Sequence, residues 1–128
     1  MSKYFYIRNQ LNNLVVTVDM FQCGGYLRLY PAYRGANQLW KWGANNSLVS
    51  KMGLAADRDG SYCVANPPTG IEQQSWQYTN DLMKNNGYYG YVMTVDKTQM
   101  ASYPYLAAVS GELSQKWMLV PEDKLAHL

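Results

Sequence analysis

The residues best suited to chemistry in this chain are aspartates that end short apolar runs and precede an aromatic residue and an amide. Asp19 follows the run Val16–Val18 and is succeeded by Tyr30 and Asn37. A carboxylate can accept hydrogen bonds from two hydroxyl groups, a tyrosine ring offers an apolar plate, and an amide adds a polar contact. This set suits a ligand with one apolar face and one edge of hydroxyl groups.

Catalytic and metal-binding patterns are poorly represented. The single histidine, His127, is the second residue from the end of the sequence, where chains usually fray, so a Ser/His or Cys/His nucleophile system is not expected. The sequence has no metal-ligand cluster, no calcium loop and no glycine-rich phosphate loop. We therefore expect a binding protein that is not an enzyme and that uses no cofactor and no metal.

The apolar runs belong to a threefold internal repeat. A Gln-x-Trp tripeptide occurs three times, with separations of 36 and 41 residues, and a tyrosine stands twelve residues before each glutamine. Each tripeptide also follows an aspartate, at intervals of 19, 17 and 19 residues from Asp to Gln. The members are Asp19, Tyr26 and Gln38-Leu39-Trp40, then Asp57, Tyr62 and Gln74-Ser75-Trp76, then Asp96, Tyr103 and Gln115-Lys116-Trp117. Such a period indicates three copies of one structural unit.

Patterning within each copy predicts short β-strands that position these residues. Residues 26–31 alternate, with two leucines on one face and Tyr, Arg and Tyr on the other. Turn residues such as Gly24-Gly25, Asp59-Gly60 and Asn85-Asn86-Gly87 separate the segments, and no window shows a capped helical stripe. The sequence therefore predicts an all-β protein. A closed threefold arrangement is favoured because closure removes exposed sheet edges.

Composition excludes several classes of partner. Lys and Arg are scattered and the net charge is only +2, so no nucleic-acid binding is expected. No stretch approaches the roughly 20 apolar residues of a membrane span, so no membrane insertion is expected. No signal peptide is visible. Cys23 and Cys63 allow at most one bridge, and free thiols are the simpler interpretation.

The repeat resembles the ricin-B-like, or R-type, β-trefoil lectins over residues 4–120. The segment from Arg28 to Trp40 is similar to the family's pattern of an aromatic residue followed by Asn-Gln-x-Trp. The short chain resembles the single-domain R-type lectins of bivalve molluscs. The resemblance implies one β-trefoil domain over residues 1–128, with repeats of about 4–44, 45–80 and 81–124. It implies twelve strands, six in a barrel and six in a triangular cap, with one sugar pocket per repeat.

The resemblance also implies roles for individual residues. The Trp of each tripeptide packs in the core, and the Gln ties down a turn. The Asp accepts from two sugar hydroxyls, the aromatic residue stacks on the sugar, and the Asn donates to a hydroxyl. The first repeat is the most complete, with Tyr33 as a further aromatic neighbour; its expected carbohydrate-binding residues are Asp19, Arg28, Tyr30, Asn37 and Gln38.

The other two repeats depart from the pattern. At the positions of Asp19, Tyr30 and Asn37 the second repeat has Asp57, Asn66 and Gln73. The third has Asp96, Ala107 and Ser114, with Tyr105 or Tyr103 as substitutes for the missing plate. All three copies have fewer residues between Asp and the aromatic strand than the family pattern. Thr17 or Thr94 is therefore an alternative occupant of the place given to Asp.

The resemblance implies a lectin for galactose- or N-acetylgalactosamine-terminated glycans of glycoproteins or glycolipids. It would act without calcium and cross-link cells through several sites, supplied by several pockets or by a homodimer. The alternative is a trefoil that binds another protein, such as a protease, through residues 67–69 or the tyrosine loop 87–91. Tyr26, Tyr62 and Tyr103 recur so strictly that packing in the cap or core is favoured over binding.

Overall fold

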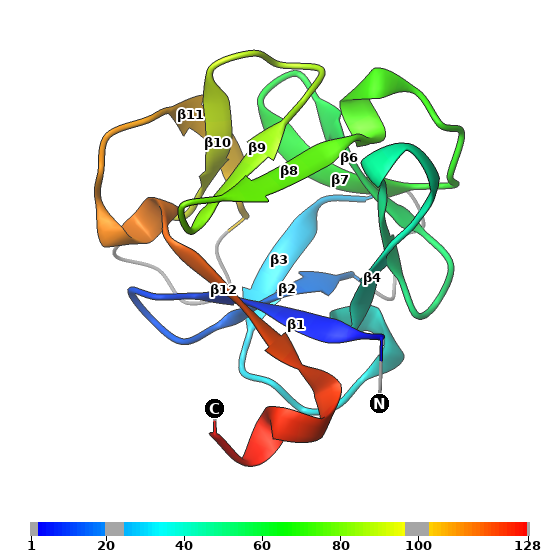
Figure 1. Ribbon diagram of the computed structural model, residues 1–128, viewed down its shortest axis with the longest axis vertical. Helices are drawn as coiled ribbons and strands as arrows, with labels where there is room; N and C mark the ends of the chain where they lie inside the picture. Colours follow the sequence, from blue (N-terminus) through cyan, green and yellow to red (C-terminus); the bar gives the residue numbers. More distant parts are fainter. Residues whose placement is uncertain (1–2, 20–24, 97–102, 128) are drawn as a thin grey trace.

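A computed structural model describes residues 3–19, 25–96 and 103–127, with side chains up to Lys124. Over these ranges the chain forms twelve short strands, and Figure 1 shows them as three lobes around a common centre. The strands are β1 (Phe5–Asn9), β2 (Val15–Val18), β3 (Leu27–Tyr30), β4 (Trp40–Trp42), β5 (Leu48–Ser50), β6 (Ala55–Asp59), β7 (Tyr62–Asn66), β8 (Trp76–Thr79), β9 (Leu82–Asn85), β10 (Tyr91–Thr94), β11 (Tyr105–Ala108) and β12 (Trp117–Pro121).

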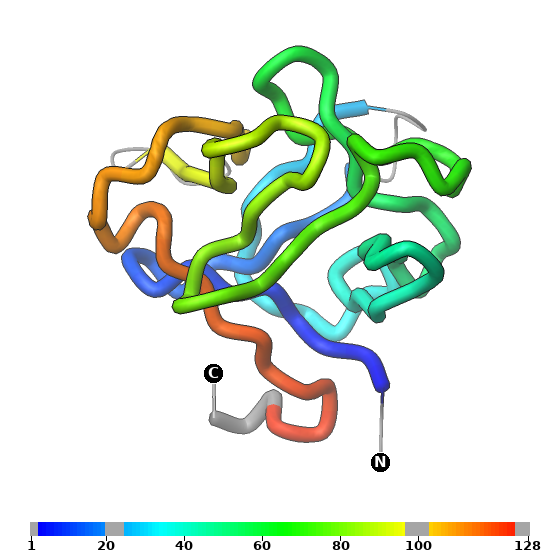
Figure 2. The backbone as a smooth tube through the Cα atoms, turned by 45° about the horizontal axis from the view of Figure 1, so that its top comes forward, coloured from blue at the N-terminus to red at the C-terminus, as the bar shows by residue number. Residues whose placement is uncertain are grey.

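Six strands form the wall of a barrel. β1 pairs antiparallel with both β4 and β12, β4 pairs with β5, and β8 pairs with β9. A bridge between Ser47 and Ser75 and a hydrogen bond from Trp117 N to Asp81 O join the remaining neighbours around the ring. Figures 1 and 2 both show β1 and β12 side by side, so the first and last strands close the barrel.

The other six strands form three hairpins, β2–β3, β6–β7 and β10–β11. The hairpins contact one another where Tyr105 pairs with Tyr62 and where Tyr26 bridges Val64. Within each hairpin, side chains alternate between the core and the outer face, because successive residues of a strand point to opposite faces. In β3, for example, Leu27 and Leu29 are fully buried while Arg28 and Tyr30 face outward.

The three tryptophans of the Gln-x-Trp tripeptides are all fully buried in one apolar core. Each follows a single 3-10 turn, formed by η1 (Ala36–Gln38), η3 (Glu72–Gln74) and η4 (Leu113–Gln115). The indole Nε1 atoms of Trp40, Trp76 and Trp117 donate to the carbonyls of Val16, Ala56 and Met93 at 3.1, 3.0 and 2.9 Å. The expectation that these residues are structural is confirmed.

The glutamines tie down the chain in the same way in each repeat. The side-chain Oε1 of Gln38 accepts from Tyr33 N, and that of Gln74 from Thr69 N. Their Nε2 atoms donate to the carbonyls of Pro31 and Pro67. Gln115 repeats both bonds with Ser110 N and Ala108 O. The glutamine therefore fixes the loop between the hairpin and the 3-10 turn, as the family resemblance implied.

Cys63 is a buried free thiol, and its burial raises the pKa of the thiol because the thiolate would lose its hydration. Cys23 lies outside the described residues. Among the described residues, no helical segment has the length and apolar character that a membrane span needs. Two further 3-10 segments, η2 (Ala44–Asn46) and η5 (Glu122–His127), follow β4 and β12.

Candidate binding pocket

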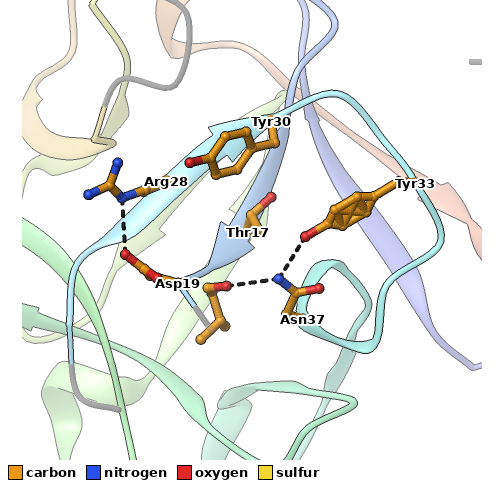
Figure 3. Close-up of a pocket in the computed structure, with 7 residues that line it drawn as sticks. Thr17, Asp19, Arg28, Tyr30, Tyr33 and Asn37 are labelled. Carbon is orange, nitrogen blue, oxygen red and sulfur yellow. Dashed lines mark hydrogen bonds and ion pairs between the residues drawn. The ribbon is translucent and has the colours of Figure 1, made fainter. Parts of the chain in front are cut away.

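Residues predicted in the first repeat gather around one pocket of about 330 Å³, which we call the β2–β3 pocket (Figure 3). The outer faces of β2 and β3 supply its floor, because Thr17 pairs with Arg28 and Val15 pairs with Tyr30 in the hairpin register. The residue after β2 and the loop that leads into η1 supply its sides. The lining residues are Thr17, Val18, Asp19, Arg28, Tyr30, Tyr33 and Asn37.

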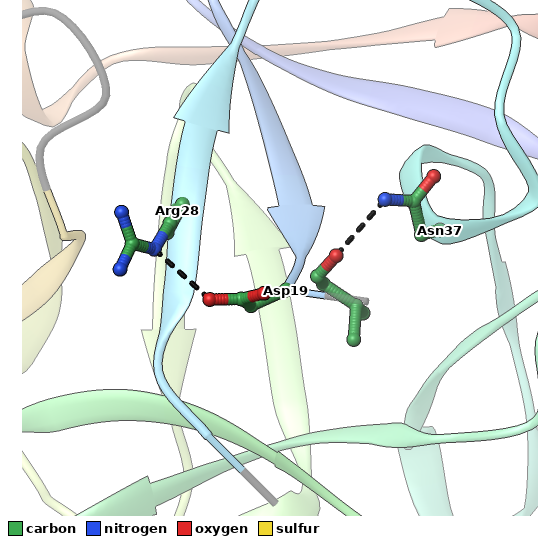
Figure 4. A network of polar contacts seen from close by, with 4 residues as sticks. Asp19, Arg28 and Asn37 are labelled. Carbon is green, nitrogen blue, oxygen red and sulfur yellow. Dashed lines mark hydrogen bonds and ion pairs between the residues drawn. The ribbon is translucent and has the colours of Figure 1, made fainter. Parts of the chain in front are cut away.

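A charge pair forms one wall of the pocket (Figure 4). Arg28 Nε lies 3.2 Å from Asp19 Oδ2, and both side chains are partly exposed. The Arg28 guanidinium carbon also lies 4.7 Å from the centre of the Tyr103 ring, at cation–π distance. The arginine is thus held between a carboxylate and an aromatic face. It presents a cation and an anion together at the pocket, where both can meet polar groups of a ligand.

Asn37 acts differently from the expectation that it donates to a ligand. Its Nδ2 atom donates to Val18 O at 2.9 Å and to the Tyr33 hydroxyl at 2.8 Å, which uses both amide hydrogens (Figure 3). Asn37 is therefore a positioning residue for Tyr33. Because the Tyr33 oxygen accepts from Asn37, its own hydrogen remains to be donated at the pocket.

Gln38 lies beneath the pocket and does not line it. The residue is fully buried, and its Nε2 atom lies 3.3 Å from Thr17 Oγ1 in addition to bonding the Pro31 carbonyl. Its placement supports the floor residue Thr17 and the loop that carries Tyr33. Gln38, which was expected in the carbohydrate site, therefore positions the residues that line it.

The second repeat corrects the register that the sequence suggested. Gln74 Nε2 donates to Asp57 Oδ2 at 3.1 Å, whereas Gln38 and Gln115 reach Thr17 and Thr94 in the same way. The bonded pairs are 21, 17 and 21 residues apart. Asp57 therefore corresponds to Thr17 and Thr94, and not to Asp19 and Asp96. The cause is a connection between the hairpin strands that is shorter by four residues in this repeat.

Asp57 is the centre of a buried polar network. Only 3% of the residue is exposed, and its carboxylate accepts from Arg58 N at 2.7 Å, Asn66 Nδ2 at 3.0 Å and Gln74 Nε2. Gln73 lies nearby, and its carbonyl accepts from Asn85 Nδ2 at 2.8 Å. The predicted residues Asp57 and Asn66 are thus brought together, but they bind each other.

The predicted residues of the third repeat have different contacts from those of the first repeat. Ser114 is buried, and its carbonyl accepts from Val95 N and Asn9 Nδ2. Tyr105 is partly buried and pairs with Thr94, so it occupies the place that Arg28 has in the first repeat. Asp96 is exposed at the end of a described range, and residues 97–102 lie outside the described residues.

The three recurring tyrosines do not pack in the core. Tyr26, Tyr62 and Tyr103 are 42%, 49% and 38% exposed. The ring centre of Tyr26 lies 5.2 Å from each of the other two, so the rings form an exposed cluster where the three hairpins meet. The expectation of packing in the cap or core is confirmed for the cap, which the three hairpins form. The tyrosines pack on each other outside the core, and Tyr103 supports Arg28.

Both loops considered for protein binding are held by internal contacts. Residues 67–69 are tied to Gln74 through Pro67 O and Thr69 N. In the tyrosine loop, the rings of Tyr88 and Tyr91 stack at 4.2 Å, and Arg58 lies over Tyr88. Tyr89 between them is 97% exposed.

No protein-family model and no curated protein matches this sequence. Solved structures do match its fold. The C-half of an earthworm R-type lectin, solved with N-acetylgalactosamine, has a TM-score of 0.82 at 19% identity, over 94% of this chain and 99% of that one. The designed threefold symmetric protein ThreeFoil has a TM-score of 0.79 at 20% identity, over 93% and 99%.

A third structure is the β-trefoil lectin of the Vibrio vulnificus hemolysin/cytolysin, solved with N-acetyl-D-lactosamine. Its TM-score is 0.78 at 12% identity, over 93% of this chain and 94% of that one. At identities of 12 to 20%, the similarity to these structures concerns the fold alone. Together with the strand pairing and the three equivalent tryptophans, it shows that this chain is a β-trefoil with three Gln-x-Trp repeats and pseudo-threefold symmetry.

Proposed function

We propose that this protein is a lectin that binds terminal galactose or N-acetylgalactosamine of glycans in the β2–β3 pocket. The observation that carries the proposal is the convergence of Asp19, Arg28 and Tyr30 on one pocket of the outer hairpin face. Two of the structures with the same fold were solved with N-acetylgalactosamine or N-acetyl-D-lactosamine, which supports a carbohydrate as the ligand class.

The chemistry of galactose matches the lining of the pocket. Because its 4-hydroxyl is axial, the ring has one face of C–H groups and one edge rich in hydroxyls. The partly exposed Tyr30 ring supplies a plate for the apolar face. The Asp19 carboxylate accepts from adjacent hydroxyls, while Arg28 and the Tyr33 hydroxyl donate to ligand oxygens. An equatorial 4-hydroxyl, as in glucose, would place a polar group toward the plate.

Cross-linking of cells requires more than one such binding site in each particle. A shallow site with one plate and a few hydrogen bonds buries little area, so a single sugar binds weakly. Linking sites multiplies avidity without new contacts. We propose that glycoproteins or glycolipids are cross-linked through a further pocket or through a homodimer.

For a single sugar we expect a dissociation constant of about 0.1 to 1 mM for galactose, and weaker binding of glucose. Isothermal titration calorimetry of both sugars checks this, and adding a calcium chelator is expected to leave the galactose affinity unchanged. Equal affinity for galactose and glucose would contradict the role assigned to the Tyr30 plate.

A further inference from the structure

A second cavity, of about 250 Å³, adjoins the β2–β3 pocket. It is lined by Tyr33, Gly35, Ala36, Asn37 and Met52. Tyr33 and Asn37 line both spaces, so the two spaces lie next to each other at these side chains. The surface of this cavity is mostly carbon. An apolar substituent is therefore favoured there over a hydroxyl group.

One polar atom remains available beside this apolar surface. Asn37 uses both Nδ2 hydrogens on Val18 O and Tyr33 Oη, while its Oδ1 accepts no hydrogen bond from the described residues. The residue is only 4% exposed. A Cβ on Gly35 would lie 2.4 Å from Asn37 Oδ1, so this oxygen lies against Gly35, which lines the second cavity. An acceptor that receives no donor from the described residues favours a ligand that brings an N–H or O–H group.

We infer that this second cavity, which we call the acylamino cavity, receives the acetamido group at C2 of N-acetylgalactosamine when the sugar ring lies in the β2–β3 pocket. The inference rests on the function proposed above. An acetamido group has one N–H donor and one methyl group. The donor matches Asn37 Oδ1, and the methyl group matches the apolar surface formed by Ala36 and Met52. Galactose has a hydroxyl at C2, which can donate to Asn37 Oδ1 but leaves the apolar surface without a methyl group.

Through this cavity, Met52 of the second repeat contributes to the preference for N-acetylgalactosamine over galactose. Met52 lies in the turn between β5 and β6, and it is 42% exposed. A substitution there removes apolar surface from the cavity without emptying a core position. Met118 on β12 has a similar exposure of 44% and lines neither the β2–β3 pocket nor the acylamino cavity. It provides a matched control for the loss of an exposed methionine.

The test is calorimetry of galactose, N-acetylgalactosamine and N-propanoylgalactosamine with the wild type, Met52→Ser and Met118→Ser. We expect the wild type to bind N-acetylgalactosamine about fourfold more tightly than galactose, since the apolar cavity buries one added methyl group. The propanoyl derivative is expected to gain up to about fourfold more, because the cavity has room for another CH₂ group. The ratio of N-acetylgalactosamine to galactose affinity falls toward one in Met52→Ser and stays at the wild-type value in Met118→Ser.

Equal affinity of the wild type for galactose and N-acetylgalactosamine would overturn the acylamino cavity and leave the galactose pocket standing. A preference that Met52→Ser retains in full would also overturn it, because the preference would then arise elsewhere. If neither sugar binds the folded wild type, the proposed lectin function fails together with this inference.

Discussion

Alanine at position 40 is expected to lower the free energy of unfolding by about 3 to 5 kcal/mol. Trp40 is fully buried among the core residues, and its Nε1 donates to Val16 O, which loses this partner in the variant. The loss is a large fraction of the roughly 5 to 15 kcal/mol that stabilises a domain. Chemical denaturation followed by circular dichroism measures it. Because Gln38 and the loop of the β2–β3 pocket adjoin Trp40, sugar binding would be lost indirectly.

Trp42→Ala is the matched control, since Trp42 lies two residues further along β4 and is 40% exposed. We expect it to cost clearly less than Trp40→Ala. Trp76→Ala and Trp117→Ala are expected to behave like Trp40→Ala, because both indoles are buried and donate to equivalent carbonyls. Melting of all three core variants at the wild-type temperature, with sugar binding lost, would show that these residues bind ligand instead.

The second large effect is expected at Asp19 and Asp57, two aspartates with similar sequence contexts whose substitutions should have different consequences. Asp19→Ala is expected to abolish detectable galactose binding, since a charged acceptor at the wall of the pocket has no substitute, while its cost in unfolding free energy is about 1 kcal/mol or less. Asp57→Ala is expected to cost about 2 to 3 kcal/mol, because donors on Asn66 and Gln74 lose their partner in the interior. Calorimetry measures the galactose affinity of each variant, and thermal melts measure its stability.

Asp19→Asn refines this comparison because it keeps the shape of the side chain and removes its charge. It is expected to weaken binding in the same direction as Asp19→Ala. We expect Tyr30→Ala to weaken galactose binding. Asp96→Ala is expected to reduce the agglutination of cells less than Asp19→Ala does. If Asp57→Ala alone abolished sugar binding in a folded protein, the assignment of the β2–β3 pocket would be wrong.

The fold was predictable because its signals are local and occur three times. Each Gln-x-Trp tripeptide forms the same 3-10 turn and places its tryptophan at the same core position, so chance similarity is excluded by repetition. Much of the first pocket was predictable for a related reason. Asp19, Arg28 and Tyr30 follow from strand alternation in a single hairpin, where a side chain's face depends only on its position.

The remaining features depend on contacts between segments. The residues that correspond to Asp57 in the other repeats could not be identified by counting, because the hairpin connection in the second repeat is shorter. The interval of 17 residues between Asp57 and Gln74, against 19 in the other repeats, was the available sign of this difference. The use of the Asn37 amide hydrogens depends on how residues 31–35 fold back and bring the Tyr33 hydroxyl to it. Met52 reaches the same region from the next repeat, and no spacing rule indicates that contact.

The most direct test of the lectin proposal is an NMR titration of the isotope-labelled protein with galactose, raised to about 20 mM to exceed the expected dissociation constant. We expect the backbone amide signals of Thr17, Arg28 and Asn37 to shift in a saturable way. These shifts should exceed those of their second-repeat counterparts Asp57, Val64 and Gln73. Saturable shifts centred on the second-repeat residues, or no shifts in a folded protein at the highest concentration, would contradict galactose binding in the β2–β3 pocket.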